Sequence, residues 1–230
     1  MYRVASFDIG KKNFSFCIEE YDLEIIGGIK KIPKTRRYKE DGTPSPEFLK
    51  SLDALVGAGR IISFRNEDLT VGCKDKKYIE PELFQNMYDY LDSLAEEWDL
   101  CNVFVVEMQM SFGKRYNTMA LKLGQHCQSY FHFRYGRFKE VVEFPAYHKT
   151  QVLGAEKVRS VTKKGKVSYK ALDKPGRKKW SVEMAFSFLC DRDDFKNLAE
   201  LERNKKKDDI ADCLLQALAF CWLRCVDGAV

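Results

Sequence analysis

The sequence predicts a single α/β domain built on a mixed β-sheet, and three of its features support this fold class. Residues 2–9 and 13–20 are two short apolar segments separated by a tight turn, which indicates an antiparallel pair of strands. Residues 102–107 form a continuous apolar run that ends in a carboxylate, as in a central strand buried on both faces. Helical and strand patterns alternate after that run. Strands first, then alternating helices and strands, favour a mixed sheet covered by helices.

The chain has 230 residues, which fits one domain. A third strand is expected at 23–30, beside the first two. Residues 31–80 contain scattered prolines and glycines, so we treat them as an insertion or irregular flank holding a short helix near 47–56 and a strand near 60–65. The remaining predicted elements are a helix from Pro81 to about Glu97, a helix near 117–135, a strand at 139–144, and helices near 178–190, 194–203 and 208–226.

The composition is that of a folded protein of a reducing compartment. Hydrophobic residues make up 45% of the chain and aromatic residues 13%, which is ample for a buried core, and the net charge is +5. The eight cysteines form no C-x-x-C pair, so neither a zinc site nor a thioredoxin-like motif is expected. The first residues resemble no signal or transit peptide, and no apolar run is long enough for a membrane span. We therefore expect an intracellular protein that does not enter a membrane.

Two predicted strands end in an acidic residue. Asp8 lies at the end of the first strand, and Glu107 lies at the end of the apolar run. A single acid at a strand end is commonly a turn cap or a solvent-exposed side chain. Two central strands that both end in an acid are harder to explain in this way, because neighbouring strands would project both carboxylates from the sheet at a similar height. We therefore predict a shared acidic site.

The last predicted helix adds three carboxylates near its start, at Asp208, Asp209 and Asp212. At about 100° per residue, Asp209 and Asp212 lie roughly 60° apart on the flank of an otherwise apolar helix, with Asp208 close to Asp212. Acids in a first turn commonly cap free N–H groups and favour the helix dipole. This accounts for Asp208 or Asp209, but it accounts poorly for Asp212.

Carboxylates that converge on one spot repel each other and raise each other's pKa unless cations bind. Magnesium prefers oxygen ligands of this kind, and a pair of such ions promotes hydrolysis of a phosphodiester. The chain shows no convincing nucleophile triad, and its three histidines, His126, His132 and His148, are expected to be core or surface residues rather than ligands. The pattern therefore favours metal-dependent phosphodiester hydrolysis.

Four motifs of the chain resemble those of RuvC-like Holliday junction resolvases and occur in the same order. The motifs are most similar to the poxvirus type, which other large DNA viruses share. They are FDIGKKN at 7–13, VVEMQ at 105–109, RKKWSVE at 177–183 and KDDIAD at 207–212. The resemblance covers about residues 1–30 and 100–225, whereas the segment 31–80 departs from the shorter members.

This resemblance implies a ribonuclease-H-like fold with a mixed five-stranded sheet flanked by helices. It also implies a homodimer that cuts four-way DNA junctions by magnesium-assisted hydrolysis into paired symmetric nicks, with manganese as a substitute metal. Carried over by position, the catalytic metal ligands are Asp8, Glu107, Asp209 and Asp212. Asp208 is the alternative to Asp209, because helical geometry alone does not separate them. For a viral protein of this kind, the host-cell sites of viral DNA replication are the expected location.

Basic residues gather in segments that we expect to contact DNA phosphates. Between Lys157 and Lys179 the chain has ten Lys or Arg residues and one acid, Asp173. Such a run is often only a solvated loop, but this one is expected beside the acidic site, where phosphate contacts would supply affinity rather than sequence choice. The residues expected to bind DNA are Lys11, Lys12, Lys114, Arg115, Lys163, Lys164, Lys166, Arg177, Lys178, Lys179, Lys206 and Lys207.

The helix near 117–135 is a candidate for the dimer interface. Gly124 lies near its middle, where it costs helix stability but permits close approach of another helix. The resemblance to these resolvases implies that this helix forms part of the dimer interface. A packing contact within one chain is the alternative.

Three other functions fit parts of the pattern. Another nuclease of the same fold, acting on RNA–DNA hybrids or on flap or branched DNA, would share the acidic residues. An actin-like ATP-binding protein also has Asp-x-Gly in a phosphate loop, but it needs a second Gly-rich loop in the later half, which the sequence lacks. A DNA-binding structural protein without catalysis is disfavoured by the intact set of acids.

Overall fold

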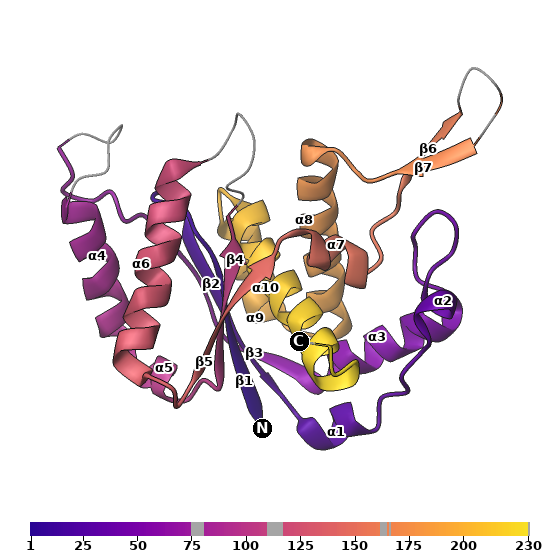
Figure 1. The fold of residues 1–230 in the computed structure, drawn as a ribbon, viewed down its shortest axis with the longest axis horizontal. Coiled ribbons are helices and arrows are strands. Elements are labelled where there is room, and N and C mark those ends of the chain that lie inside the picture. Colours follow the sequence, from indigo (N-terminus) through magenta and orange to yellow (C-terminus); the bar gives the residue numbers. More distant parts are fainter. Residues whose placement is uncertain (75–80, 110–116, 162–164, 166, 230) are drawn as a thin grey trace.

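The computed structural model describes residues 1–74, 81–109, 117–161, 165 and 167–229. A five-stranded sheet runs through the middle of the molecule, with helices on both of its faces (Figure 1). The strand order is β3-β2-β1-β4-β5. The predicted mixed five-stranded sheet flanked by helices is therefore confirmed.

The sheet is mixed because its two halves differ in direction. β1 (Tyr2–Asp8) pairs antiparallel with β2 (Phe14–Tyr21), and β2 pairs antiparallel with β3 (Gly59–Glu67). β4 (Val103–Met108) runs parallel to β1, and β5 (Glu140–Pro145) runs parallel to β4. Because parallel neighbours point the same way, β1, β4 and β5 have their carboxyl ends at one edge of the sheet.

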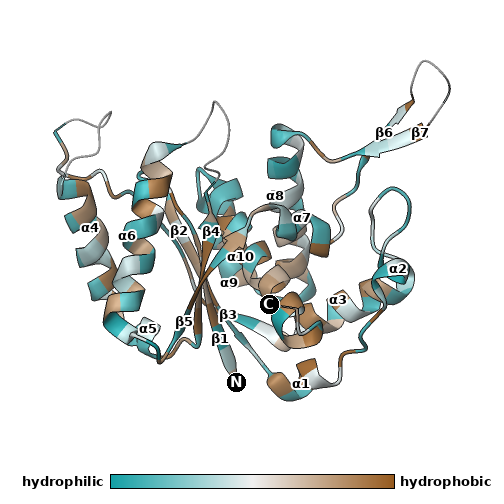
Figure 2. Ribbon diagram, viewed as in Figure 1, coloured by the Kyte–Doolittle hydropathy of each residue, from teal (hydrophilic) through white to brown (hydrophobic). Residues whose placement is uncertain are grey.

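Both faces of β4 are buried, which explains its unbroken apolar run. Val103 and Val105 belong to one core, whereas Phe104 and Val106 belong to the core on the opposite face. The second core is rich in aromatic rings, and Phe104 stacks on Phe131 with ring centroids 3.9 Å apart. Figure 2 shows hydrophobic residues along these central strands, between helices that carry hydrophilic residues on their outer sides.

One face of the sheet is covered by α4 (Pro81–Ser93), α5 (Ala95–Asp99) and α6 (Thr118–Tyr135). The helix predicted from Pro81 to about Glu97 is therefore two helices, separated at Leu94, whose φ of −112° is outside the helical range. The predicted helix near 117–135 is confirmed as α6.

The other face carries a helix that is buried on nearly all sides, α10 (Lys207–Cys221), in which every residue from Ile210 to Cys221 except Asp212 is buried. A short π-helical segment, η1 (Trp222–Val226), continues it. The other helices of this layer are α1 (Leu23–Gly27), α2 (Lys34–Arg37), α3 (Pro46–Ala58), α7 (Tyr147–Val152), α8 (Lys174–Asp191) and α9 (Phe195–Arg203). Within the described residues, no helix has the length and apolar character needed to cross a membrane.

The prediction of a strand at 23–30 is wrong, because this segment begins with the helix α1. Asp22 caps the helix: its carboxylate accepts hydrogen bonds from the backbone N–H groups of Glu24 and Ile25. A side-chain cap of this kind satisfies N–H groups that a strand would need to pair with a neighbour. The strand beside β2 comes instead from β3, which lies inside the stretch 31–80.

The stretch 31–80 supplies α2, α3 and β3, and its first part is tied to the end of the chain. The guanidinium of Arg37 forms two hydrogen bonds with the carboxylate of Asp227, at 2.6 and 2.7 Å, and both side chains are almost fully buried. Arg37 also lies over the rings of Phe48 and Trp222. Phe48 belongs to the same core as α10, so α3 packs on the body of the domain.

Two strands that the sequence pattern did not indicate form a separate hairpin. β6 (Val158–Val161) pairs antiparallel with β7 (Val167–Lys170), and neither strand joins the central sheet. Four-residue strands rich in Lys, Ser and Val lack the strict alternation by which longer strands are recognised. The hairpin extends away from the body at the upper right of Figure 1.

Candidate active site

The edge of the sheet where β1 and β4 end brings two predicted site residues together. Phe7 is paired with Val106 in the parallel ladder, so the residues that follow, Asp8 and Glu107, lie at the same level of neighbouring strands. Asp8 is partly buried, and the side chain of Glu107 is 17% exposed. The two strand ends thus place a pair of acids at one spot on the surface.

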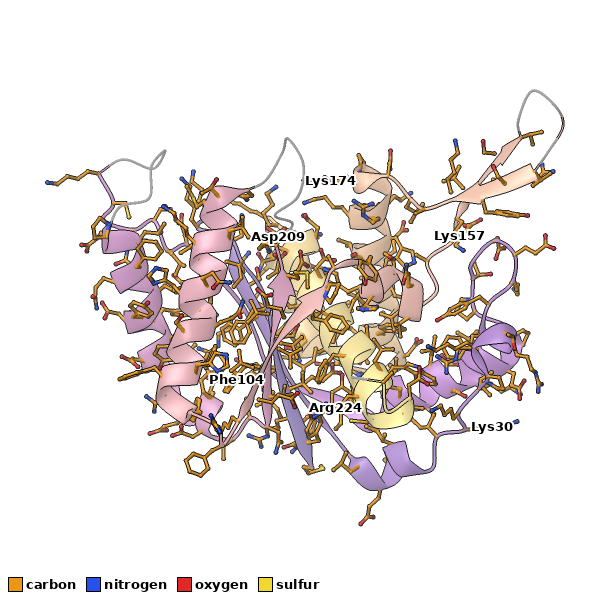
Figure 3. All side chains as sticks on the ribbon, in the orientation of Figure 1. Lys30, Phe104, Lys157, Lys174, Asp209 and Arg224 are labelled. Carbon is orange, nitrogen blue, oxygen red and sulfur yellow. The ribbon has the colours of Figure 1, made fainter. Side chains whose placement is uncertain are left out.

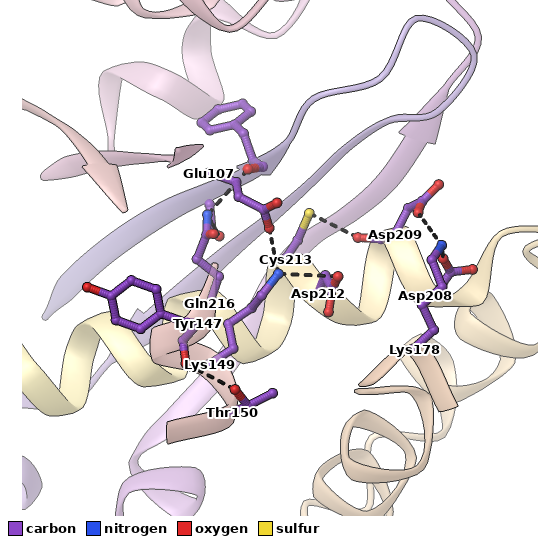
Figure 4. A network of polar contacts seen from close by, with 12 residues as sticks. Glu107, Tyr147, Lys149, Thr150, Lys178, Asp208, Asp209, Asp212, Cys213 and Gln216 are labelled. Atoms are coloured by element: carbon purple, nitrogen blue, oxygen red, sulfur yellow. Dashed lines mark hydrogen bonds and ion pairs between the residues drawn. The ribbon is translucent and has the colours of Figure 1, made fainter. Parts of the chain in front are cut away.

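A lysine connects Glu107 with the start of α10 (Figure 4). The Nζ of Lys149, on α7, lies 2.6 Å from Oε2 of Glu107 and 3.2 Å from Oδ2 of Asp212. Lys149 is only 5% exposed, so its charge is held inside the site rather than in solvent. Three segments that are distant in the sequence, β4, α7 and α10, therefore meet at one ammonium group.

Lys149 was missed by sequence reasoning. It stands four residues after β5, the parallel neighbour of β4, and so returns to the same edge of the sheet as Glu107. The available signal was a basic residue just beyond a strand that runs beside the Glu107 strand. That signal is weak without knowledge of the strand order, because exposed lysines after strands are common.

The electrostatics of the site are those of crowded carboxylates with one compensating cation. Burial raises the pKa of Asp8 well above its ordinary value, the charge of Glu107 raises it further, and Lys149 opposes both effects. Burial alone would lower the pKa of Lys149, but the charges of Glu107 and Asp212 outweigh it and raise that pKa. The site therefore favours a bound positive charge.

Asp208 and Asp209 differ in their surroundings. Lys178, on α8, donates a hydrogen bond to Asp208, and its Nζ lies 3.9 Å from Oδ1 of Asp209. Despite partial burial, this hydrogen bond lowers the pKa of Asp208, whereas burial and the charge of Asp208 raise the pKa of Asp209 to about 6. The charge of Asp209, together with that of Asp212, also contributes to the raised pKa of Asp8. Asp209 is thus the less neutralised of the two and the one that acts on Asp8.

Gln216 attaches α10 to the two strands that end in acids. Its Nε2 donates hydrogen bonds to Oγ of Ser6 at 3.0 Å, to the carbonyl of Phe7 at 3.3 Å and to the carbonyl of Val105 at 3.1 Å. The side chain is fully buried, and within the described residues its Oε1 has no hydrogen-bond partner. Gln216 stands one helical turn after Asp212, so these bonds set the register of Asp212 against Asp8 and Glu107.

The predicted ligands fit a divalent cation by their chemistry. Within the described residues, no three His, Cys, Asp or Glu side chains converge tightly enough to form a metal site as they stand. The ammonium of Lys149 lies between Glu107 and Asp212 and supplies the local positive charge. All the predicted donors are carboxylate oxygens, which hard cations prefer. Burial first and neighbouring negative charges second raise the pKa values of Asp8 and Asp209, and a bound cation would oppose both effects.

The basic residues predicted to bind DNA lie in several places. Lys11 and Lys12 follow β1 in the turn after Asp8, and Lys206 and Lys207 begin α10. Arg177, Lys178 and Lys179 lie on the first turns of α8, where Lys178 contacts the acids of α10. The other predicted DNA-binding residues lie outside the described part of the chain; they are Lys114, Arg115, Lys163, Lys164 and Lys166.

Two viral proteins are similar to this chain over most of its length. Protein 170L of Invertebrate iridescent virus 6 is 36% identical over 232 residues, which cover 96% of this chain and 89% of that protein. Protein 97L of Invertebrate iridescent virus 3 is 30% identical over 227 residues, which cover 93% and 98%. Both are described as uncharacterised, and no family model matches the chain.

Solved structures with the same fold include a poxvirus resolvase and RuvC of Thermus thermophilus. Fowlpox virus resolvase in complex with its substrate Holliday junction DNA aligns with a TM-score of 0.52 and 16% identity over 95% of both chains. Thermus thermophilus RuvC aligns with a TM-score of 0.54 and 12% identity over 98% of this chain and 96% of that one. Its complex with a Holliday junction aligns with a TM-score of 0.55 and 14% identity over 100% and 98%. The predicted resemblance to these resolvases is therefore confirmed in the fold.

Proposed function

We propose that this chain, which belongs to a family of invertebrate iridescent virus proteins that includes 170L and 97L, is a metal-dependent endonuclease that resolves four-way DNA junctions. The observation that carries the proposal is that Glu107 and Asp212 share one buried ammonium group at the carboxyl edge of the sheet, where Asp8 ends the strand beside Glu107. The substrate is inferred from the fowlpox and Thermus proteins, which share this fold and whose structures include Holliday junctions.

In this proposal Asp8, Glu107, Asp209 and Asp212 hold magnesium, for which manganese substitutes. The metal supplies Lewis-acid stabilisation of the charge that develops on the phosphodiester. Lys149 forms ion pairs with Glu107 and Asp212 and fixes their positions. Gln216 keeps α10 in register with β1 and β4, so that the four carboxylates face one phosphate.

The proposed DNA-binding residues are the basic residues that the sequence predicts. They are Lys11, Lys12, Arg177, Lys178, Lys179, Lys206 and Lys207, together with Lys114, Arg115, Lys163, Lys164 and Lys166. We also propose a homodimer, because a two-fold pair of sites matches two strands of like polarity in a junction. Such an enzyme would act in the host cell, where viral DNA is replicated.

The deciding experiment is cleavage of a synthetic four-way junction with all strands end-labelled in turn, with and without magnesium. We expect magnesium-dependent nicks at matching positions of opposing strands, and products that a ligase seals. A linear duplex and an RNA–DNA hybrid of the same sequence should be cut far more slowly. Equal rates on the hybrid would favour a general nuclease of this fold, and no cleavage of any substrate would contradict the proposal.

A pair of matched variants tests whether Asp208 or Asp209 is the metal ligand. Asp209→Asn should reduce cleavage more than about 100-fold, since loss of a group that only orients a metal ligand already costs roughly 10- to 100-fold. Asp208→Asn should cost less, because Lys178 already neutralises that carboxylate. Single-turnover rates on the junction measure both. The reverse order would make Asp208 the ligand.

Gln216→Leu tests the register of α10. We expect cleavage to fall while junction affinity is kept, and urea unfolding should show a loss of about 1–3 kcal/mol from the missing hydrogen bonds. Leu218→Ala is the matched control on the same buried helix, with an expected loss of about 2–5 kcal/mol. If both variants lose stability and both keep the wild-type rate, Gln216 has only a structural role.

A further inference from the structure

The hairpin of β6 and β7 lies on the side of the molecule that carries the acidic site. Figure 3 labels Asp209, Lys157 and Lys174 in the upper half of the view, whereas Lys30 and Arg224 lie in the lower half. Lys157 immediately precedes β6, and Lys174 begins α8 shortly after β7. A DNA duplex that leaves the site in this direction would therefore meet the hairpin.

The two faces of the hairpin differ in chemistry. Arg159 is paired with Tyr169, and Val161 is paired with Val167, so these four side chains share one face. The valines of this face are 54% and 42% exposed. The opposite face carries Val158, Ser160, Ser168 and Lys170, and the hydroxyl of Ser168 donates to the carbonyl of Ser160 within the hairpin. The face of Arg159 thus combines a guanidinium with two exposed valines, whereas the opposite face combines Lys170 with one exposed valine and two serines.

The charge of this segment has a single sign. From Lys157 to Leu172 the sequence contains six Lys or Arg residues and no Asp or Glu. Of these, the structure describes Lys157, Arg159 and Lys170, and all three are exposed. This composition complements a polyanion such as DNA.

Hydrogen bonds connect both ends of the hairpin to the rest of the protein. The backbone N–H of Lys157 donates to the carbonyl of Asp41 at 2.6 Å, and Nη1 of Arg177 donates to the carbonyl of Leu172 at 3.0 Å. The turn that holds Asp41 includes Gly42 at φ 86°, where an added Cβ would lie 3.1 Å from the carbonyl of Ala155. An isolated two-stranded hairpin is marginally stable in water. The turn at Asp41 and the start of α8 therefore hold the two ends of the hairpin.

We propose that the β6–β7 hairpin is an arm that enters the major groove of a DNA duplex, with the face of Arg159 toward the bases. This inference rests on the proposed function and adds a contact away from the cleaved phosphate. The major groove admits a two-stranded ribbon, arginine pairs with guanine O6 and N7, and apolar side chains contact thymine methyl groups. The minor groove, about 6 Å wide, is too narrow for such a ribbon. Lys170, on the other face, contacts the backbone phosphates.

The test is protection of guanine N7 from dimethyl sulfate, measured without divalent metal on a long-armed junction and on a plain duplex. Wild-type protein should protect N7 positions within a duplex arm, and Arg159→Gln should abolish this protection and weaken binding at least about 5-fold. Lys170→Gln should leave the protection and lower the salt-dependence slope of binding by roughly 0.9. Lys50→Gln, which removes one exposed charge on α3, is the matched control and should change neither.

All three positions are exposed, so the variants should fold with the wild-type melting temperature, which circular dichroism checks. Absence of N7 protection by the wild type, or protection unchanged in Arg159→Gln, would overturn the proposed arm. Because binding is measured without metal, this outcome is independent of cleavage. A chain that protects N7 but never cuts a junction would keep the arm and lose the nuclease.

Discussion

Glu107→Gln is expected to lower the rate of junction cleavage by more than about 100-fold, beyond the roughly 10- to 100-fold cost of losing a group that only orients a ligand. The substitution keeps the size of the side chain but removes the charge that a divalent cation needs. It also removes the hydrogen-bonded partner of Lys149 and the strongest charge acting on Asp8. Single-turnover cleavage of an end-labelled junction measures the effect.

The matched control for this variant is Glu143→Gln, on the neighbouring strand β5. Glu143 is exposed and accepts a hydrogen bond from Gln128 at 2.8 Å, away from the Lys149 ammonium. The Glu143→Gln variant should cleave the junction at the wild-type rate. If Glu107→Gln kept more than about a tenth of the wild-type rate, a loss of less than 1.4 kcal/mol in transition-state stabilisation, Glu107 would not be a metal ligand.

Lys149→Met is expected to have the largest effect on stability. It leaves the carboxylates of Glu107 and Asp212 without the ammonium between them, and breaking a buried ion pair costs about 3–5 kcal/mol. For a chain of this size, that corresponds to a melting temperature lower by roughly 6–20 °C. Magnesium or manganese should then raise the melting temperature of the variant more than that of the wild type, because the cation replaces the missing charge.

Lys178→Met provides the comparison for this second variant. Lys178 also pairs with an acid of α10, but its side chain is 41% exposed, so its loss should cost at most about 1 kcal/mol. Thermal unfolding with and without metal distinguishes the two lysines. An equal metal-induced shift in the wild type and in Lys149→Met would show that the metal does not bind beside Lys149.

The strongest local patterns in the sequence predict most strands of the sheet correctly. The apolar run that ends at Glu107 is typical of a central strand buried on both faces, and β4 has this environment. The pattern of α10 left Asp212 as an acid that capping does not explain, and Asp212 is the one residue between Ile210 and Cys221 that is not buried. The prediction of a strand at 23–30 is wrong, because the capping hydrogen bonds of Asp22 favour a helix over the strand-like pattern of apolar residues after it.

Local sequence patterns specify which carboxylates stand at element ends and which elements are buried, because both follow from periodicity over a few neighbouring residues. The groups that contact those carboxylates depend on the packing of distant segments. Lys149 reaches Glu107 across 42 residues, and Gln216 reaches Val105 across 111 residues. Neither contact leaves a local pattern, since each depends on the order of strands in the sheet and on the register of α10 against them. The charge balance of the site is thus a product of packing, and so is the position of Asp212 within it.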